Sequence, residues 1–200
     1  MKVGVLALQG AFGLHERVLN RLGVAAVQVR TPDDLAEVDR LVVPGGESTA
    51  ISKLLDANGL ADPLADRLAG GLPVLGTCAG LILLAAEVVD GYPGQHCFGA
   101  VDVAVRRNGY GRQSESFSAP IEVEGWESAF PGVFIRAPVI ESAGLEVEVL
   151  AELDGVPVLC RQGSAVVSSF HPELAEDDRV HRWFVEQDWS TGHRWFTEQE

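Results

Sequence analysis

The chain has 200 residues, 46% of them hydrophobic, which is enough to bury the core of one α/β domain. Acidic residues outnumber basic ones by 29 to 15, and the resulting net charge of −14 disfavours binding to nucleic acid, since no Lys/Arg-rich block offsets it. No apolar run approaches the roughly 20 residues that span a bilayer, and the first residues lack the apolar core of a signal peptide, so we expect a cytoplasmic protein without a membrane partner.

The first half of the chain alternates between strand-like and helix-like patterns. Apolar, β-branched runs predict buried strands at 2–8, 24–29, 39–43 and 72–75. Helical spacing and capping residues predict helices at 12–22, directly after Thr31, and at 48–56, 60–68 and 81–86. This alternation indicates a mostly parallel sheet with helices on both faces.

The second half is richer in short strands, which we expect at 101–105, 121–124, 133–136, 147–153 and 156–161. Asp154-Gly155 is typical of a hairpin turn between the last two. The chain is then expected to return to the main sheet at 165–170. No linker divides these parts, so the sequence predicts one domain over 1–189.

The C-terminal tail, 190–200, contains a near-repeat. Residues 181–187 (HRWFVEQ) recur as 193–199 (HRWFTEQ). The first copy fits the last helix, whereas the second is expected either to be a duplicated tail without function or to form a contact element.

A cysteine at a sharp turn is the strongest candidate for chemistry. Cys78 lies in the segment Gly76-Thr77-Cys78-Ala79-Gly80, between the predicted strand at 72–75 and the helix-like run at 81–86. Small neighbours allow the backbone to bend tightly and are expected to leave the sulfur exposed at the sheet edge. Backbone N–H groups at the start of the helix favour a negatively charged sulfur. We therefore expect Cys78 to be a nucleophile.

A base and its orienting carboxylate follow far downstream. His171 and Glu173 stand two residues apart just after the predicted strand at 165–170, and Pro172 between them biases His171 away from the helical region. Cysteine, histidine and glutamate are the types of residue that form a nucleophile, its proton shuttle and the group that orients the shuttle. The sequence thus predicts an enzyme with a Cys-His-Glu triad.

The other cysteines and histidines have no such context. Cys97 and Cys160 lie beside apolar residues and are expected to pack as small hydrophobes. The remaining histidines are expected to be surface or packed residues: His15, His96, His181 and His193. Their spacing does not match that of metal ligands, so no metal site is predicted.

Six motifs along the chain support a more specific interpretation. They are Ala7-Leu8-Gln9-Gly10-Ala11, Pro44-Gly45-Gly46-Glu47-Ser48-Thr49, Gly76-Thr77-Cys78-Ala79-Gly80-Leu81-Ile82, Arg107-Asn108 with Gly111-Arg112-Gln113, Ser116-Phe117, and Phe170-His171-Pro172-Glu173-Leu174. In this order they resemble the class I, triad-type glutamine amidotransferases. The Leu-Gln-Gly start and the Gly-Arg-Gln segment narrow the resemblance to the glutaminase subunits of pyridoxal 5′-phosphate synthase, the PdxT/SNO family.

This resemblance implies a fold and a set of site residues. The fold would be the three-layer, flavodoxin-like fold of class I glutamine amidotransferases, with a mixed, mostly parallel sheet. By resemblance, backbone amides of Gly46 and Ala79 would form the oxyanion hole. Further residues would bind L-glutamine, with Arg107 at its α-carboxylate and Glu47 at its α-ammonium: Gly46, Glu47, Ser48, Arg107, Ile135 and Arg136.

The resemblance also implies a reaction and a partner. The chain would hydrolyse L-glutamine to glutamate and ammonia without a cofactor. It would pass the ammonia to a (β/α)8-barrel synthase subunit, in a hetero-oligomeric complex that makes pyridoxal 5′-phosphate (vitamin B6). Two alternatives remain at this level: an amidotransferase subunit that serves another acceptor, or a regulatory binding module that kept the fold and lost the activity.

Overall fold

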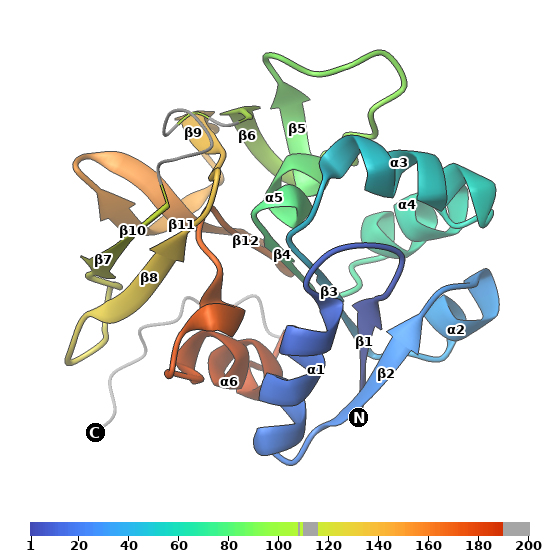
Figure 1. Cartoon of the computed structure of the whole chain (residues 1–200), viewed down its shortest axis with the longest axis horizontal. Coiled ribbons are helices and arrows are strands. Elements are labelled where there is room, and N and C mark those ends of the chain that lie inside the picture. Colours follow the sequence, from blue (N-terminus) through green and yellow to red (C-terminus); the bar gives the residue numbers. More distant parts are fainter. Residues whose placement is uncertain (108, 110–115, 190–200) are drawn as a thin grey trace.

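A central sheet organises the molecule. In the computed structural model of the chain, which describes residues 1–107, 109 and 116–189, seven strands pair in the order β10-β11-β12-β4-β3-β1-β2 (Figure 1). The five strands from β12 to β2 are parallel, and β10 and β11 add an antiparallel edge. The strands are β1 (Lys2–Leu6), β2 (Ala25–Val29), β3 (Arg40–Val43), β4 (Val74–Thr77), β10 (Glu148–Leu153), β11 (Val156–Gln162) and β12 (Ala165–Ser168). The mixed, mostly parallel sheet predicted from the sequence is confirmed.

Helices cover both faces of this sheet, as predicted. One face carries α1 (Phe12–Arg21) and α6 (Arg179–Glu186), and the other carries α2 (Pro32–Ala36), α3 (Ser48–Ala57), α4 (Ala61–Ala69) and α5 (Ala79–Leu84). The short helix α2 begins at a capping box, in which the side chains of Thr31 and Asp34 each accept a hydrogen bond from the other residue's backbone N–H. α6 contains the first copy of the HRWF sequence, whereas the second copy, in the tail 190–200, lies outside the described residues.

Two hydrophobic clusters hold the layers together. Because side chains of a strand alternate between faces, Val3 and Val5 pack toward Leu19 of α1, whereas Leu6 packs toward Leu55 of α3. Both clusters consist of side chains that are almost completely removed from solvent. The sheet is therefore buried on both faces, which explains why its parallel strands are continuous apolar runs in the sequence.

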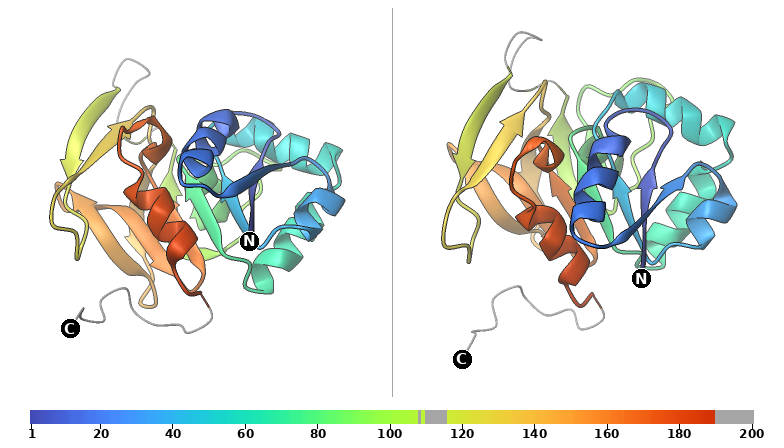
Figure 2. Two further views of the ribbon diagram at one scale, coloured as in Figure 1. Left: turned by 90° about the horizontal axis from the view of Figure 1, so that it is seen from below. Right: turned by 60° about the horizontal axis from the view of Figure 1, so that its bottom comes forward.

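Two smaller sheets form the part of the molecule beyond the central layers. Within the described residues, β5 (Ala85–Val88), β6 (Val101–Arg106) and β9 (Val139–Ala143) form a three-stranded sheet, and β7 (Phe117–Ile121) pairs with β8 (Phe130–Phe134). Figure 2 shows the β7–β8 pair beside α6, outside the central sheet. Aromatic side chains of β8 join the same cluster as Phe184 of α6.

Several boundaries in this region differ from those predicted. The helix expected at 81–86 ends at Leu84, because Ala85 adopts extended backbone angles and starts β5 within the same apolar run. The strands expected at 121–124 and 133–136 lie earlier, as β7 and β8. A turn with Gly125 at φ 77° follows β7, and the positive φ of Arg136 (47°) interrupts the extended chain after β8. β9 was not predicted, because three consecutive exposed residues hide its alternation.

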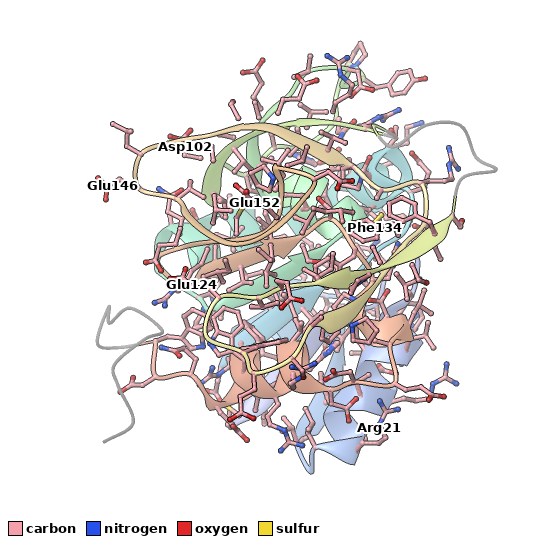
Figure 3. The ribbon with its side chains drawn as sticks, turned by 90° about the vertical axis from the view of Figure 1, so that its left-hand side faces the viewer. Arg21, Asp102, Glu124, Phe134, Glu146 and Glu152 are labelled. Carbon is pink, nitrogen blue, oxygen red and sulfur yellow. The ribbon has the colours of Figure 1, made fainter. Side chains whose placement is uncertain are left out.

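The hairpin between β10 and β11 is confirmed. Asp154 and Gly155 both have positive φ, 53° and 77°, as the tight turn between twisted strands requires. Exposed carboxylates cover the side of the molecule near this hairpin, including Asp102, Glu124, Glu146 and Glu152 (Figure 3). The acidic excess of the sequence is thus placed in solvent. Over the described residues, no helix is long and apolar enough to cross a membrane.

Candidate active site

The candidate site lies where parallel strands end side by side. β12 pairs with β4 up to Ser168 and Thr77, and β3 pairs with β4 up to Val43 and Gly76. The segments that follow these three strands therefore emerge at one edge of the sheet, where open α/β sheets bind their ligands. This arrangement brings Cys78, His171 and the Gly45–Gly46 loop together.

Cys78 occupies a strained turn between β4 and α5. Its backbone has φ 50° and ψ −102°, which a residue with a side chain rarely adopts, and its N–H donates to the Ser168 carbonyl at 2.8 Å. Close packing depends on Gly80, where a Cβ would lie 2.1 Å from the Val43 carbonyl oxygen. The predicted strand-to-helix turn is confirmed. The predicted exposure of the sulfur is wrong, since Cys78 is 7% exposed because it lies at the base of a pocket.

The histidine and the glutamate are directly bonded to each other. His171 Nδ1 lies 2.7 Å from Glu173 Oε1, and the His171 backbone N–H donates to the Val133 carbonyl of β8. Burial alone would disfavour the imidazolium, but the Cys78 sulfur and the Glu173 carboxylate outweigh it and raise the pKa of His171 to about 10. Burial likewise opposes ionisation of Glu173, yet His15 and His171 outweigh it and lower the pKa of this carboxyl.

Gly45 permits the close approach of these groups. A Cβ at this position would lie 2.5 Å from His171 Cε1 and 3.4 Å from Cys78 Cβ. His171 and Cys78 thus lie against the same glycine. The His171 Nε2 atom has no hydrogen-bond partner within the described residues, so it is available for a sulfur or a substrate. The arrangement is that of a proton shuttle whose second nitrogen is fixed by a carboxylate.

A pocket of about 290 Å³ opens above Cys78. Most residues predicted to form the site line it, together with Gly10, Ala11, Gly45 and Ile82: Gly46, Glu47, Ser48, Cys78, Arg107, Ile135, Arg136 and His171. Glu173 lies behind His171, and Ala79 is 1% exposed and follows Cys78 at the start of α5. The structure therefore brings the residues of the sequence-based site together around one cavity.

The Gly45–Gly46 loop is held on three sides. The Gly45 N–H donates to Thr77 Oγ1, the Gly45 carbonyl accepts from the Ala11 N–H, and the Glu47 N–H donates to Gln9 Oε1. The Glu47 side chain caps α3 by accepting hydrogen bonds from the N–H groups of residues 49 and 50. Glu47 is therefore the N-cap of α3, and its contact with the substrate ammonium stays a prediction.

Arg107 reaches the rim of the pocket from the end of β6. Its guanidinium donates to Thr49 Oγ1 at 3.1 Å and to Gln95 Oε1 at 3.0 Å, and it stacks over the Tyr92 ring. Its Nε has no hydrogen-bond partner among the described residues. The neighbouring Arg106 instead pairs with Glu141 away from the pocket. Of these two adjacent arginines, only Arg107 lines the pocket.

The segment after β8 closes another side of the pocket. The Ile135 carbonyl lies 3.9 Å from Cys78 Sγ, and Arg136 adopts a positive φ that turns the chain there. Of the motifs used for the resemblance, Asn108 and 111–113 lie outside the described residues. Across the described ranges, no group of three or more His, Cys, Asp or Glu side chains is arranged to hold a metal ion.

Three residues make contacts that their sequence patterns do not indicate. Gln9, in the Leu-Gln-Gly motif, accepts a hydrogen bond from the Glu47 N–H and so supports the glycine loop. His15 and His181, expected only as surface or packed residues, are completely buried: His15 lies against Glu173, and His181 lies against His15. The helical spacing of His15 with the apolar residues of α1 was the available signal. Cys97 is exposed, contrary to prediction, whereas Cys160 is buried as predicted.

Comparisons with known proteins agree with this geometry. Residues 5–189 match the SNO glutamine amidotransferase family. The chain is 54% identical to pyridoxal 5′-phosphate synthase subunit PdxT of Parafrankia sp., covering 92% of each chain, and 52% identical to the subunit of that name from Mycobacteroides abscessus, covering 92% of this chain and 95% of the relative. A solved structure described as a glutamine amidotransferase superposes with a TM-score of 0.86 at 53% identity, covering 92% of this chain and 97% of that one. The predicted amidotransferase fold is confirmed.

Proposed function

The chain belongs to the SNO glutamine amidotransferase family, and we propose that it hydrolyses L-glutamine and supplies the ammonia to a pyridoxal 5′-phosphate synthase. The observation that carries this proposal is the position of Cys78. It stands on a strained turn at the base of a pocket, next to a histidine that is bonded to a buried glutamate.

The first half of the proposed reaction releases ammonia. The Cys78 sulfur attacks the side-chain carbonyl carbon of glutamine, and the electron pair of the C=O bond moves to oxygen. The imidazolium of His171 donates its Nε2 proton to the amide nitrogen. The C–N bond then breaks, ammonia departs, and a γ-glutamyl thioester remains on the sulfur. The raised pKa of His171 supports this role, because the ring stays protonated until it transfers its proton to the amide nitrogen of glutamine.

The second half regenerates the sulfur. The neutral His171 accepts a proton from water, the oxygen attacks the thioester, and the C–S bond breaks to give glutamate. Glu173 keeps a proton on Nδ1 throughout, so that Nε2 is the nitrogen that exchanges protons. Backbone N–H groups of Gly46 and Ala79 are proposed to stabilise the oxyanion of both tetrahedral intermediates.

The remaining pocket residues are proposed to hold the amino-acid end of glutamine. Arg107 offers a cation at the rim of the pocket, where its guanidinium is proposed to bind the α-carboxylate. Glu47 offers a carboxylate near the loop, and Ser48, Ile135 and Arg136 complete the wall. Arg136 is the second candidate for the carboxylate.

We propose a (β/α)8-barrel synthase subunit as the partner, in a hetero-oligomeric complex. Relatives that are 54% and 52% identical over 92% of this chain are named as subunits of pyridoxal 5′-phosphate synthase, which supports a synthase partner. Ammonia is lost or protonated in bulk water, so direct transfer to the partner is expected. The three free cysteines in the described part of the chain suit the reducing cytoplasm.

One experiment tests the activity and the acceptor together. Pyridoxal 5′-phosphate formation is measured with the synthase subunit, its other substrates, and either glutamine or an ammonium salt. The chain should be required with glutamine and dispensable with ammonium, and Cys78→Ala should support only the ammonium reaction. Glutamine hydrolysis without product formation would instead indicate another acceptor, and absence of hydrolysis with the synthase present would contradict the proposal.

A further inference from the structure

Two buried histidines lie behind the proposed triad, and the reaction above does not use them. His15 of α1 and His181 of α6 are both completely buried, and His15 Nδ1 lies 2.8 Å from His181 Nε2. On its other edge, His15 Nε2 lies 3.4 Å from Glu173 Oε2 and 3.2 Å from Thr77 Oγ1. His15 therefore contacts the side of Glu173 opposite His171.

The Glu173 carboxylate needs such a neighbour. Its side chain is fully buried, and Oε1 is bonded to His171. Oε2 forms no hydrogen bond within the described residues, and His15 Nε2 is an ion-pairing distance from it. A buried carboxylate with one oxygen uncompensated is costly. An N–H directed at Oε2 from His15 would lower that cost.

The surroundings decide which nitrogen of His15 carries the proton. Burial disfavours the charged form and lowers the pKa of His15, and it lowers the pKa of His181 to about 3, so both rings are neutral. A neutral imidazole has one N–H, and the anionic Glu173 favours its position on Nε2. Nδ1 of His15 is then an acceptor for the N–H on His181 Nε2. This leaves His181 Nδ1 without a proton, at an atom that has no hydrogen-bond partner among the described residues.

His15 also connects the carboxylate to the glycine loop. Thr77 Oγ1, which His15 Nε2 contacts, accepts the hydrogen bond of the Gly45 N–H at 3.1 Å. One imidazole thus lies between the orienter of the proposed base and the loop proposed to bind the oxyanion. The position of the His15 ring is fixed by His181. At the surface, an ion pair between Arg21 (Figure 3) and Asp178 connects the end of α1 to the start of α6.

We propose that His15 is a positioning residue for glutamine hydrolysis. Its single Nε2–H is shared between Glu173 Oε2 and Thr77 Oγ1. It thereby keeps Glu173 ionised and directed at His171, and it holds the threonine that accepts the hydrogen bond of the Gly45 N–H. His181 acts one step further away by orienting the His15 ring. This inference rests on the proposed glutaminase function. The titratable and charged groups that act on this cluster are Cys78, His171 and Glu173 from the strand ends, His15 and Arg21 from α1, and His181 and Asp178 from α6.

A matched pair of amide variants tests the role of the Nε2–H. His15→Gln can place an N–H close to the former Nε2 position, whereas the shorter His15→Asn reaches only the Nδ1 position, toward His181. If the Nε2–H compensates the charge of Glu173 as a hydrogen bond to a charged group would, its loss corresponds to about a 10- to 100-fold change in rate. In the complex with the synthase, we expect His15→Asn to lower kcat for glutamine by that factor with little change in KM, and His15→Gln to retain most of the wild-type kcat.

The pH profile separates positioning from general damage to the fold. Without the Nε2–H, the pKa of Glu173 should rise, so the acidic limb of kcat/KM should move to higher pH in His15→Asn and stay in place in His15→Gln. Leu19→Ala is the structural control: it removes buried packing from the same helix and should lower Tm without moving the limb. His181→Leu should give a smaller shift in the direction of His15→Asn.

The outcomes distinguish this inference from the proposed function. If wild type does not hydrolyse glutamine, the function itself fails. If wild type is active and both amide variants fold and match it in kcat and pH profile, or both lose activity equally, the Nε2–H has no positioning role. If His15→Asn does not fold, the pH profile of kcat/KM for His181→Leu is compared with that of Leu19→Ala. An acidic limb at the same pH in both variants would overturn the inference.

Discussion

The two sides of His171 are built in different ways. Its Nε2 side faces the pocket, where a glycine loop, the exposed Ile135 and the rim residue Arg107 surround a cavity open to solvent. Its Nδ1 side faces Glu173, and behind that carboxylate the histidines of two helices are fully removed from water. The pocket side is suited to admitting substrate and releasing ammonia. The buried side is suited to fixing one charge and one orientation, because electrostatic interactions are stronger where water is excluded.

Removing the nucleophile should have the largest effect. Cys78→Ala is expected to lower glutamine hydrolysis by on the order of 10⁴-fold or more, because the thioester cannot form. Binding of the synthase subunit and Tm should change little. The control is Cys97→Ser, which alters an exposed cysteine away from the pocket lining. Ammonia release by Cys78→Ala at more than a small fraction of the wild-type rate would assign the nucleophile to another residue.

Breaking the buried side should cost less than removing the sulfur. Glu173→Gln keeps the shape of the side chain but loses the charge that favours the imidazolium. We expect residual activity about 10- to 100-fold above that of Cys78→Ala, since the reacting groups remain. Steady-state kcat with the synthase present measures this ranking. Activity of Glu173→Gln close to wild type would show that the pocket side alone orients His171.

Arg107→Ala should damage the pocket side without touching the chemistry. Loss of a charge-assisted contact with the substrate carboxylate should raise KM for glutamine about 10-fold or more and leave kcat nearly unchanged. Arg106→Ala is the matched control, because this arginine pairs with Glu141 outside the pocket. An unchanged KM in Arg107→Ala would transfer the carboxylate contact to Arg136.

On the buried side, the free energy of unfolding should also depend on pH. His181 has a pKa of about 3 in the folded chain and an ordinary value of 6.5, so below pH 6.5 the unfolded state takes up a proton that the folded state does not. The free energy of unfolding should therefore fall by about 1.4 kcal/mol per pH unit for this group as the pH decreases from 6.5 toward 4.

Neighbouring groups do not cancel this slope. The lowered pKa of Glu173 adds to the loss below its usual value of 4.5. The raised pKa of His171 acts elsewhere, because its stabilisation is complete below pH 6.5 and is lost as the pH rises through about 10. Urea unfolding of wild type, His181→Leu and Leu19→Ala at pH 4.5, 5.5 and about 6.5 measures the slope. The highest of these pH values is where the contribution of His181 should begin to fall. His181→Leu should be less pH-dependent by one proton; an unchanged slope would show that another group is responsible.

The amino-acid sequence by itself determined the parallel half of the fold and pointed to the groups that are proposed to react. Continuous apolar runs predict the buried strands β1, β3 and β4, and the segment around Cys78 and the pair His171–Glu173 form local motifs. The turn at Asp154-Gly155 was equally local, because its backbone conformation depends on which residues tolerate positive φ. Such features are encoded by neighbours in the chain.

The tertiary structure alone decided what lies behind the reacting groups. His15 and His181 are 166 positions apart, and each by itself is a histidine on an amphipathic helix. The packing of α1 and α6 on one face of the sheet places both rings behind Glu173. The difference between Arg106 and Arg107 arose in the same way, from where β6 ends relative to the pocket. A hydrogen bond or ion pair between residues so far apart in the sequence depends on where whole helices and strands lie relative to one another. The residue pattern of a single segment does not contain that information.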